Sequence, residues 1–159
     1  MKQYRRASLL PGRNAVPLTQ TQISRAATMI FGLDQTVNAR YEAGSFTRFV
    51  VRNDEFGEEI GEIIFSDDIY QGTNLANPNS ILSLKGAAVH ELAHYYRWQG
   101  GTELPHGHLT HLDEAMTSLE AALRYFPDLD RTDMQGLISD ALQRLRHYVN
   151  DEPPPRAAE

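Results

Sequence analysis

Apolar residues recur at spacings of three and four in four separate stretches of the chain, which is the period of an amphipathic helix. Glycines, prolines and polar residues separate these stretches. The last stretch begins with Thr132 and Gln135, a pair typical of a capping box. We therefore expect four helices, over Leu18–Leu33, Ile81–Trp98, Leu112–Phe126 and Thr132–Val149.

Two segments between the first and second helices have the character of β-strands. Ser45–Arg52 and Glu59–Phe65 are rich in β-branched and aromatic residues, and the turn-like sequence NDEFGE separates them. They predict a β-hairpin. With the helices, the hairpin indicates an α+β fold in which a small antiparallel sheet packs on a buried helix. Glu59–Phe65 precedes the second helix, where it could be an edge strand with which an extended peptide pairs or an ordinary hairpin strand that covers the core, and the pattern does not separate the two.

The second and third helices differ in how their apolar residues are distributed. In Ile81–Trp98 these residues go nearly all the way round the helix, which is typical of a buried, central position. In the third helix they fall on one face, which we expect to pack toward the outer part of the core. That face consists of Leu112, Met116, Leu119, Leu123 and Phe126.

Length and hydrophobic content set the expected domain organisation. The chain has 159 residues, of which 41% are hydrophobic, and this is enough for one globular domain with a core of its own. We expect this domain to span residues 18–150. Residues 1–17 are expected to form a flexible arm, and residues 151–159, which include three consecutive prolines, a disordered tail.

Charge and composition exclude several classes of function. The formal net charge of -6 disfavours binding to a nucleic acid backbone, and no stretch reaches the roughly 18 apolar residues that a membrane helix needs. Without cysteine the chain forms no disulfide and offers no thiolate ligand. The arginine pair Arg5–Arg6 is not followed by the apolar stretch of an export signal. We expect a cytoplasmic protein that binds neither nucleic acid nor membrane.

The motif that carries chemistry is His90-Glu91-Leu92-Ala93-His94, an HExxH sequence inside the segment expected to be a buried helix. Residues four apart lie one turn apart on the same helix face, so both imidazoles can reach one zinc ion. Glu91 points to a neighbouring face. There its carboxylate can act as general base toward a water molecule activated by the zinc.

The alternative is that the motif arose by chance in a histidine-rich segment. Two imidazoles and a carboxylate would then lie buried on an apolar helix without a ligand, at roughly 1 to 3 kcal/mol each unless they found other partners. The metal-binding interpretation avoids this destabilisation. We therefore expect one zinc ion per chain.

A catalytic zinc site needs a third protein ligand and one open position. Beyond the motif, four candidate residues carry suitable side chains and lie at plausible distances along the chain. Spacing alone leaves these candidates open. They are His106, His111, Glu114 and Glu120.

From His90 to Leu123 the sequence resembles the gluzincins, the thermolysin-like clan of HExxH peptidases. In that clan the third zinc ligand is a glutamate about 20 residues after the motif, on the next helix, and the resemblance implies Glu114. Helical geometry agrees, because Glu114 lies on the opposite side of its helix from the apolar residues. Ser118 stands where the clan often has an aspartate that supports a ligand histidine. We expect Asp113 to supply that support instead.

Two other HExxH families share shorter features with this chain. Glu120 would be the third ligand by similarity to the phage-repressor-cleaving peptidases of the ImmA type. The SprT-like peptidases share HELAH, a tryptophan four residues later, here Trp98, and a third histidine in a PHG-like segment, here His106. SprT-like proteins act on DNA-bound proteins and carry basic or cysteine-rich additions, which this chain lacks.

The pattern as a whole predicts a zinc-dependent peptidase that hydrolyses peptide bonds in an intracellular protein. His90, His94 and Glu114 are the expected zinc ligands, and Glu91 is the expected catalytic residue. The alternative function is a non-catalytic module that binds a metal or a partner protein and acts as a regulator. The sequence does not indicate an oligomeric state.

Overall fold

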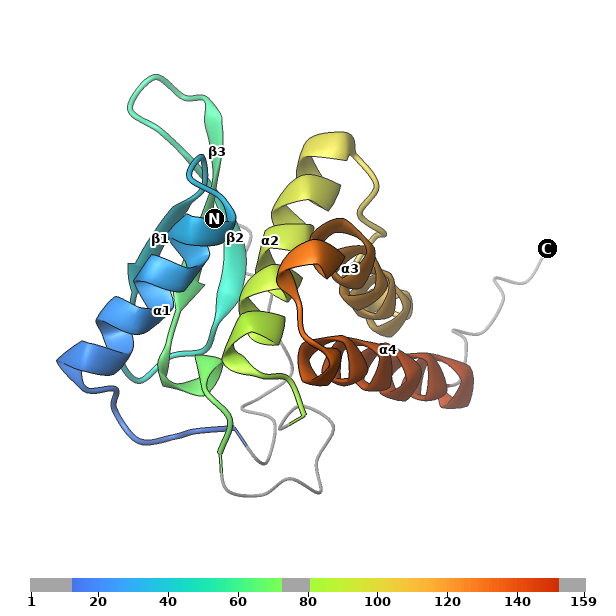
Figure 1. Cartoon of the computed structure of the whole chain (residues 1–159). Coiled ribbons are helices and arrows are strands. Elements are labelled where there is room, and N and C mark those ends of the chain that lie inside the picture. The colour runs from blue at the N-terminus through green and yellow to red at the C-terminus, as the bar shows by residue number, and fades with distance from the viewer. Residues whose placement is uncertain (1–12, 73–80, 152–159) are drawn as a thin grey trace.

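The computed structural model describes residues 13–72 and 81–151 and confirms the expected α+β fold (Figure 1). Four α-helices and three strands make up most of these residues, and a short 3-10 turn over Asp67–Ile69 and another over Phe126–Asp128 connect some of them. In chain order the helices and strands are α1 Gln20–Leu33, β1 Asn38–Tyr41, β2 Arg48–Asn53, β3 Glu59–Phe65, α2 Leu84–Gly100, α3 Thr110–Tyr125 and α4 Arg131–Asn150.

The sheet contains the expected hairpin and one strand more. β2 and β3 pair antiparallel across a turn in which Gly57 has a φ of +80°, a conformation that glycine adopts without strain. β1 pairs parallel with β3 on its other side, so the sheet is mixed and β3 is its central strand. Of the two possibilities for Glu59–Phe65, the edge strand is therefore excluded. β1 and β2 are the outer strands.

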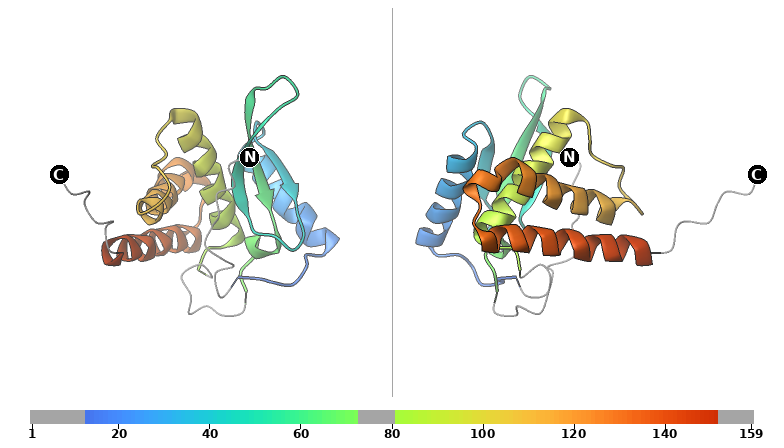
Figure 2. Two further views of the ribbon diagram at one scale, coloured as in Figure 1. Left: turned by 180° about the vertical axis from the view of Figure 1, so that it is seen from behind. Right: turned by 45° about the vertical axis from the view of Figure 1, so that its right-hand side comes forward.

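The structure is arranged in layers, with α2 between the sheet on one side and the α3–α4 pair on the other (Figures 1 and 2). α1 packs against β1 and α2. Ile63 and Phe65 of β3 belong to the central apolar cluster together with Ile30 of α1 and Leu92 of α2, and all four are buried. α2 contacts the sheet, α1, α3 and α4, which explains why its apolar residues surround it.

Local signals fix both ends of α2 and the start of the helices around it. The Ser83 side chain accepts a hydrogen bond from the backbone N–H of Gly86, and Gly101 ends the helix in the left-handed conformation. Thr19 caps α1 in a capping box. The capping box of α4 lies two residues earlier than expected, because Asp130 and Asp133 form it in place of Thr132 and Gln135.

The expectation for the apolar face of the third helix is wrong. The apolar face of α3 does not pack into the core, since Leu123 is 77% exposed and Met116 and Leu119 are also exposed. α3 instead turns small buried residues, such as Ala115 and Ala121, toward its neighbours. Within the segment expected to form an arm, the Arg13 guanidinium donates to the carbonyl oxygens of Asp68, Ile69 and Leu82 at 2.6 to 2.7 Å. Residues 1–12, and the tail beyond Asp151, lie outside the described residues.

A matched pair of glycine substitutions tests how closely α4 approaches the segment before α2. A Cβ at Gly136 would lie 2.8 Å from the carbonyl oxygen of Ile81, whereas a Cβ at Gly32 in α1 would have no atom of another segment within 4 Å. We expect Gly136→Ala to lower the free energy of unfolding by about 1 to 3 kcal/mol. Gly32→Ala should raise it by about 0.4 to 1 kcal/mol, as alanine does in an open helical position. If urea unfolding shows that both substitutions change the free energy of unfolding equally, the close approach of α4 to Ile81 is contradicted.

Candidate metal centre

α2 places the two histidines of the HExxH motif one above the other on the side that faces α3. Their ring centroids lie 4.8 Å apart and their planes are at 83°. His90 is completely buried, and His94 is partly buried one turn later. The i, i+4 spacing on a rigid, packed helix therefore holds both rings at one place, as the sequence predicts.

Glu114 of α3 meets both rings with the same carboxylate oxygen. Its Oε2 lies 2.9 Å from Nε2 of His90 and 3.4 Å from Nε2 of His94. Two ring nitrogens and this oxygen all lie within 4.8 Å of one another, and no other such group occurs among the described residues. Ligand atoms about 2.1 Å from a tetrahedral ion stand about 3.4 Å apart, so these three atoms fit around one metal ion with little movement.

Glu91 lies beside the two histidines but does not belong to this group of ligand atoms. It is only 2% exposed, and it is rotated by about 100° around α2 from His90. On the same side of α2, two turns later, Trp98 contacts Phe49 of β2 with ring centroids 5.9 Å apart. Glu91 therefore occupies the side of the centre that borders β2.

A chain of hydrogen bonds behind His90 fixes which ring nitrogen is available to a metal. Ser118 Oγ lies 2.8 Å from His90 Nδ1 and donates its single proton to Asp140 Oδ2 at 2.6 Å. The hydroxyl therefore accepts from Nδ1–H, and Nε2 is the ring nitrogen that faces Glu114 and can reach a metal ion. Ser118 and Asp140 are both buried, so water competes little with this chain of contacts.

Arg144 connects this chain to the carboxylate ligand. Its Nε donates to both oxygens of Asp140, at 3.1 and 3.3 Å, and its Nη1 lies 3.9 Å from Glu114 Oε2. Burial alone would raise the pKa of the Glu114 carboxyl. The positive charges of His94 and Arg144 and the hydrogen bonds from His90 and His94 outweigh burial and hold this pKa well below its usual range. The Glu114 carboxyl is therefore ionised at neutral pH, as a metal ligand needs to be.

Asp113 does not support a ligand histidine, contrary to the expectation from sequence. Its carboxylate accepts a hydrogen bond from Arg97 of α2 at 2.5 Å and another from the backbone N–H of Leu104 at 2.9 Å. These contacts hold the connection between α2 and α3. Asp113 points to this side because it is rotated by about 100° around α3 from Glu114.

The rival third ligands lie elsewhere. Glu120 pairs with Arg124 at 3.2 Å and with Arg97 at 3.7 Å. His106 is exposed in the connection between α2 and α3. His111 stacks on His147 of α4 with ring centroids 5.1 Å apart. Of the candidates that the sequence left open, the structure brings Glu114 to the two histidines.

Sequence reasoning missed Asp140 and Arg144, although α4 carries a signal for them. They lie four residues apart among Leu137 and Ala141, which are buried on the same side of the helix. A charged i, i+4 pair on an otherwise apolar face indicates an internal ion pair. The partner of that pair, Ser118, is 22 residues away from Asp140 in the chain, so the sequence pattern alone does not identify it.

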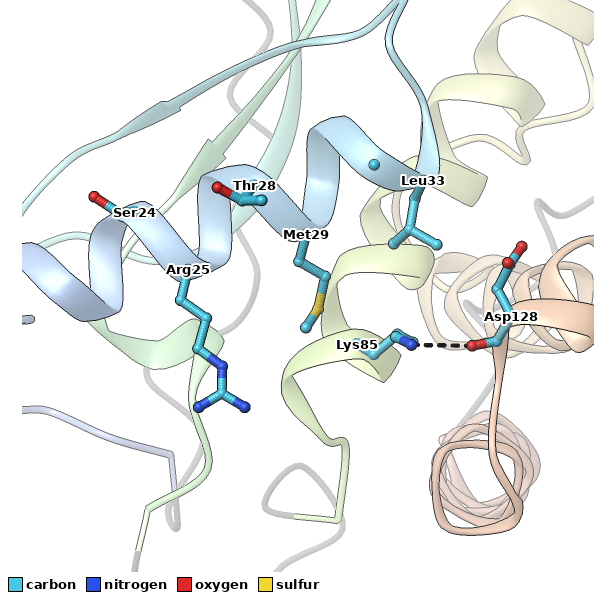
Figure 3. Close-up of a pocket in the computed structure, with 8 residues that line it drawn as sticks. Ser24, Arg25, Thr28, Met29, Leu33, Lys85 and Asp128 are labelled. Atoms are coloured by element: carbon cyan, nitrogen blue, oxygen red, sulfur yellow. Dashed lines mark hydrogen bonds between the residues drawn. The ribbon is translucent and has the colours of Figure 1, made fainter.

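A hollow lies on a different part of the molecule from the candidate metal centre, between α1, the start of α2 and the turn after α3 (Figure 3). Its volume is about 540 Å³. Met29 and Leu33 provide apolar walls, and the Lys85 ammonium at its edge donates to the carbonyl oxygen of Asp128 at 3.1 Å. None of the three candidate metal ligands lines this hollow, and it does not contribute to the centre.

Comparisons with protein families, with characterised proteins and with solved structures find no match to this chain. Within the described ranges, no helix combines the length and the apolar character needed to cross a lipid bilayer. The geometry of the centre is therefore the basis on which a function can be proposed.

Replacing Asp140 tests whether the hydrogen-bond chain supports the metal centre. Asp140→Asn keeps the size of the side chain but removes the negative charge that orients the Ser118 hydroxyl, and we expect affinity for Co²⁺ to fall by about 10- to 100-fold. Asp128→Asn, on an exposed residue outside the centre, is the control and should leave affinity unchanged. Competition with a chromophoric chelator measures both. Equal affinities in folded Asp140→Asn and wild type would contradict a supporting role.

Proposed function

We propose that this chain is a zinc-dependent peptidase. The observation that carries the proposal is the convergence of His90 Nε2, His94 Nε2 and Glu114 Oε2, with the buried Glu91 beside them. Two imidazoles and one carboxylate are a donor set that zinc takes in hydrolytic enzymes, where a fourth position stays open. The resemblance to the gluzincins from His90 to Leu123 supports the same assignment.

Each residue has a distinct part in the proposed reaction. When bound, zinc would lower the pKa of a coordinated water toward about 7 and polarise the carbonyl of the peptide bond. Glu91 accepts the proton of the attacking water and delivers it to the leaving amine. His90 keeps the correct tautomer through Ser118 and Asp140, and Arg144 balances the charges of Asp140 and Glu114.

The position of β2 suggests how an extended peptide would bind. β2 is an outer strand of the sheet, and Phe49 near its start packs against Tyr95 and Trp98 of α2. Its outer edge therefore runs along the side of α2 on which Glu91 lies. We propose that the substrate pairs with this edge and not with β3, and so presents one peptide bond to the centre.

The proposed pairing with the edge of β2 also bears on the class of substrate. A strand edge recognises any extended backbone, and selectivity then depends on the side chains at either end of the bond that is cleaved. We propose limited cleavage of an intracellular protein, with one zinc ion per chain. The alternative is a regulatory module in which the metal is structural and Glu91 has no chemical part.

Glu91→Gln separates these two functions. The substitution keeps the shape of the side chain and the three ligands but removes the group that accepts a proton. We expect zinc to remain bound at about one ion per chain while cleavage falls by about 10²-fold or more. Because the substrate is unidentified, the measurement compares new protein termini in a cell proteome exposed to wild type and to the variant.

Glu55→Gln is the matched control, since Glu55 is an exposed glutamate in the β2–β3 turn. It should produce the same termini as wild type. If wild type and Glu91→Gln, both loaded with zinc, give the same set of new termini, Glu91 is not the general base. The peptidase proposal then fails and the regulatory module becomes the better account.

A further inference from the structure

Arg144 lies between two carboxylates at the candidate metal centre. Its Nε donates to both oxygens of Asp140, at 3.1 and 3.3 Å, and its Nη1 lies 3.9 Å from Glu114 Oε2. That Glu114 oxygen is the one that meets both histidine rings. The side chains of Arg144, Asp140 and Glu114 are only 10%, 1% and 13% exposed. Water therefore screens these charges little, and the guanidinium acts strongly on the carboxylate that would hold a metal ion.

The position of Arg144 is fixed by its own helix. Asp140 precedes it by four residues, one turn of α4, and also accepts the proton of Ser118 Oγ at 2.6 Å. If the guanidinium moved out toward water, the buried Asp140 carboxylate would lose its cation, and an uncompensated buried charge destabilises a fold strongly. Arg144 is therefore a positive charge held at a set distance from Glu114.

A metal ion on Glu114 would share the Oε2 atom with Arg144. An ion about 2.1 Å from Oε2 would lie no more than about 6 Å from Nη1. Arginine stays protonated in proteins and has no lone pair with which to bind a metal. The guanidinium and a divalent cation therefore attract the same carboxylate and repel each other, so each weakens the hold of the carboxylate on the other.

In protein from which a chelator has removed the metal, the same guanidinium has a favourable effect. Glu114 and Asp140 are then two negative charges in a largely buried place, and a buried carboxylate needs a cation beside it. Arg144 contacts both carboxylates and so keeps the ligand on α3 and the residue that supports His90 together. One charge therefore favours the assembled centre and disfavours the bound ion.

We propose that Arg144 is an internal counter-cation, which keeps the three ligands assembled without a metal ion and lowers their affinity for one. The inference rests on the proposed metal centre and concerns the regulation of that centre. Because the ion is held less tightly, a higher concentration of available metal is needed to load the protein. In the proposed peptidase, metal supply would then control the amount of active protein.

Arg144→Gln tests this role, because glutamine can still donate to Asp140 but carries no charge. We expect affinity for Co²⁺ to rise by about 10-fold or more and the thermal midpoint of the chelator-treated protein to fall. Competition with a chromophoric chelator measures the affinity, and calorimetry in EDTA measures the midpoint. Arg146→Gln, on an exposed arginine of the same helix, is the control and should change neither.

The sign of the change in affinity separates this role from simple support of the centre. If Arg144 only held Asp140 in position, Arg144→Gln would weaken Co²⁺ binding, as Asp140→Asn is expected to do. An unchanged or lower affinity in folded Arg144→Gln would therefore overturn the proposal.

Arg144→Lys separates charge from hydrogen-bond geometry, and it carries the test if Arg144→Gln does not fold. Lysine keeps the charge but not the planar fork, so affinity for Co²⁺ should stay within about fivefold of wild type, and a larger fall would overturn the proposal. Wild type that binds no Co²⁺ would overturn the metal centre itself and this inference with it. Neither readout depends on cleavage, so the outcome is independent of the Glu91→Gln test of the peptidase.

Discussion

The contact of one Glu114 oxygen with the ring nitrogens of His90 and His94 is the constraint around which the other helices are arranged. It brings an ionised carboxylate into a largely buried position between α2 and α3. Such a charge is stable there only if cations and hydrogen-bond donors surround it. The two histidines of α2 and Arg144 of α4 are these cations and donors. α2, α3 and α4 therefore have to keep their relative positions for the cluster to form. A metal ion at the same point would satisfy all three ligands at once and add its binding energy to folding.

The inner and outer faces of α4 differ in the residues that they carry. Its inner face carries Asp140 and Arg144, which hold His90 and Glu114 in place through buried hydrogen bonds. Its outer face carries an apolar row that the folded chain leaves exposed. The orientation of His90 and Glu114 therefore depends on α4 keeping its position against α3.

Sequence predicts well what depends on local spacing and poorly what depends on tertiary neighbours. The four helices, the β2–β3 hairpin and the pairing of His90 with His94 all follow from residues close in the chain. Glu114 follows from the resemblance together with its position around α3. The parallel strand β1 has only four residues and no clear apolar alternation, so its pattern is too short to identify. The apolar row of α3 shows which side of the helix avoids water, but not that the folded chain leaves this side uncovered.

The most direct test of the account is anomalous diffraction at the zinc absorption edge from crystals of the zinc-loaded protein. The account predicts one peak per chain, about 2.1 Å from Nε2 of His90, Nε2 of His94 and a carboxylate oxygen of Glu114, with no fourth protein ligand. His90 Nδ1 should still contact Ser118. A peak that lacks Glu114, or one at the stacked His111–His147 pair, would contradict the assignment of the centre. A fourth ligand from the protein would close the open position and contradict the proposed hydrolysis.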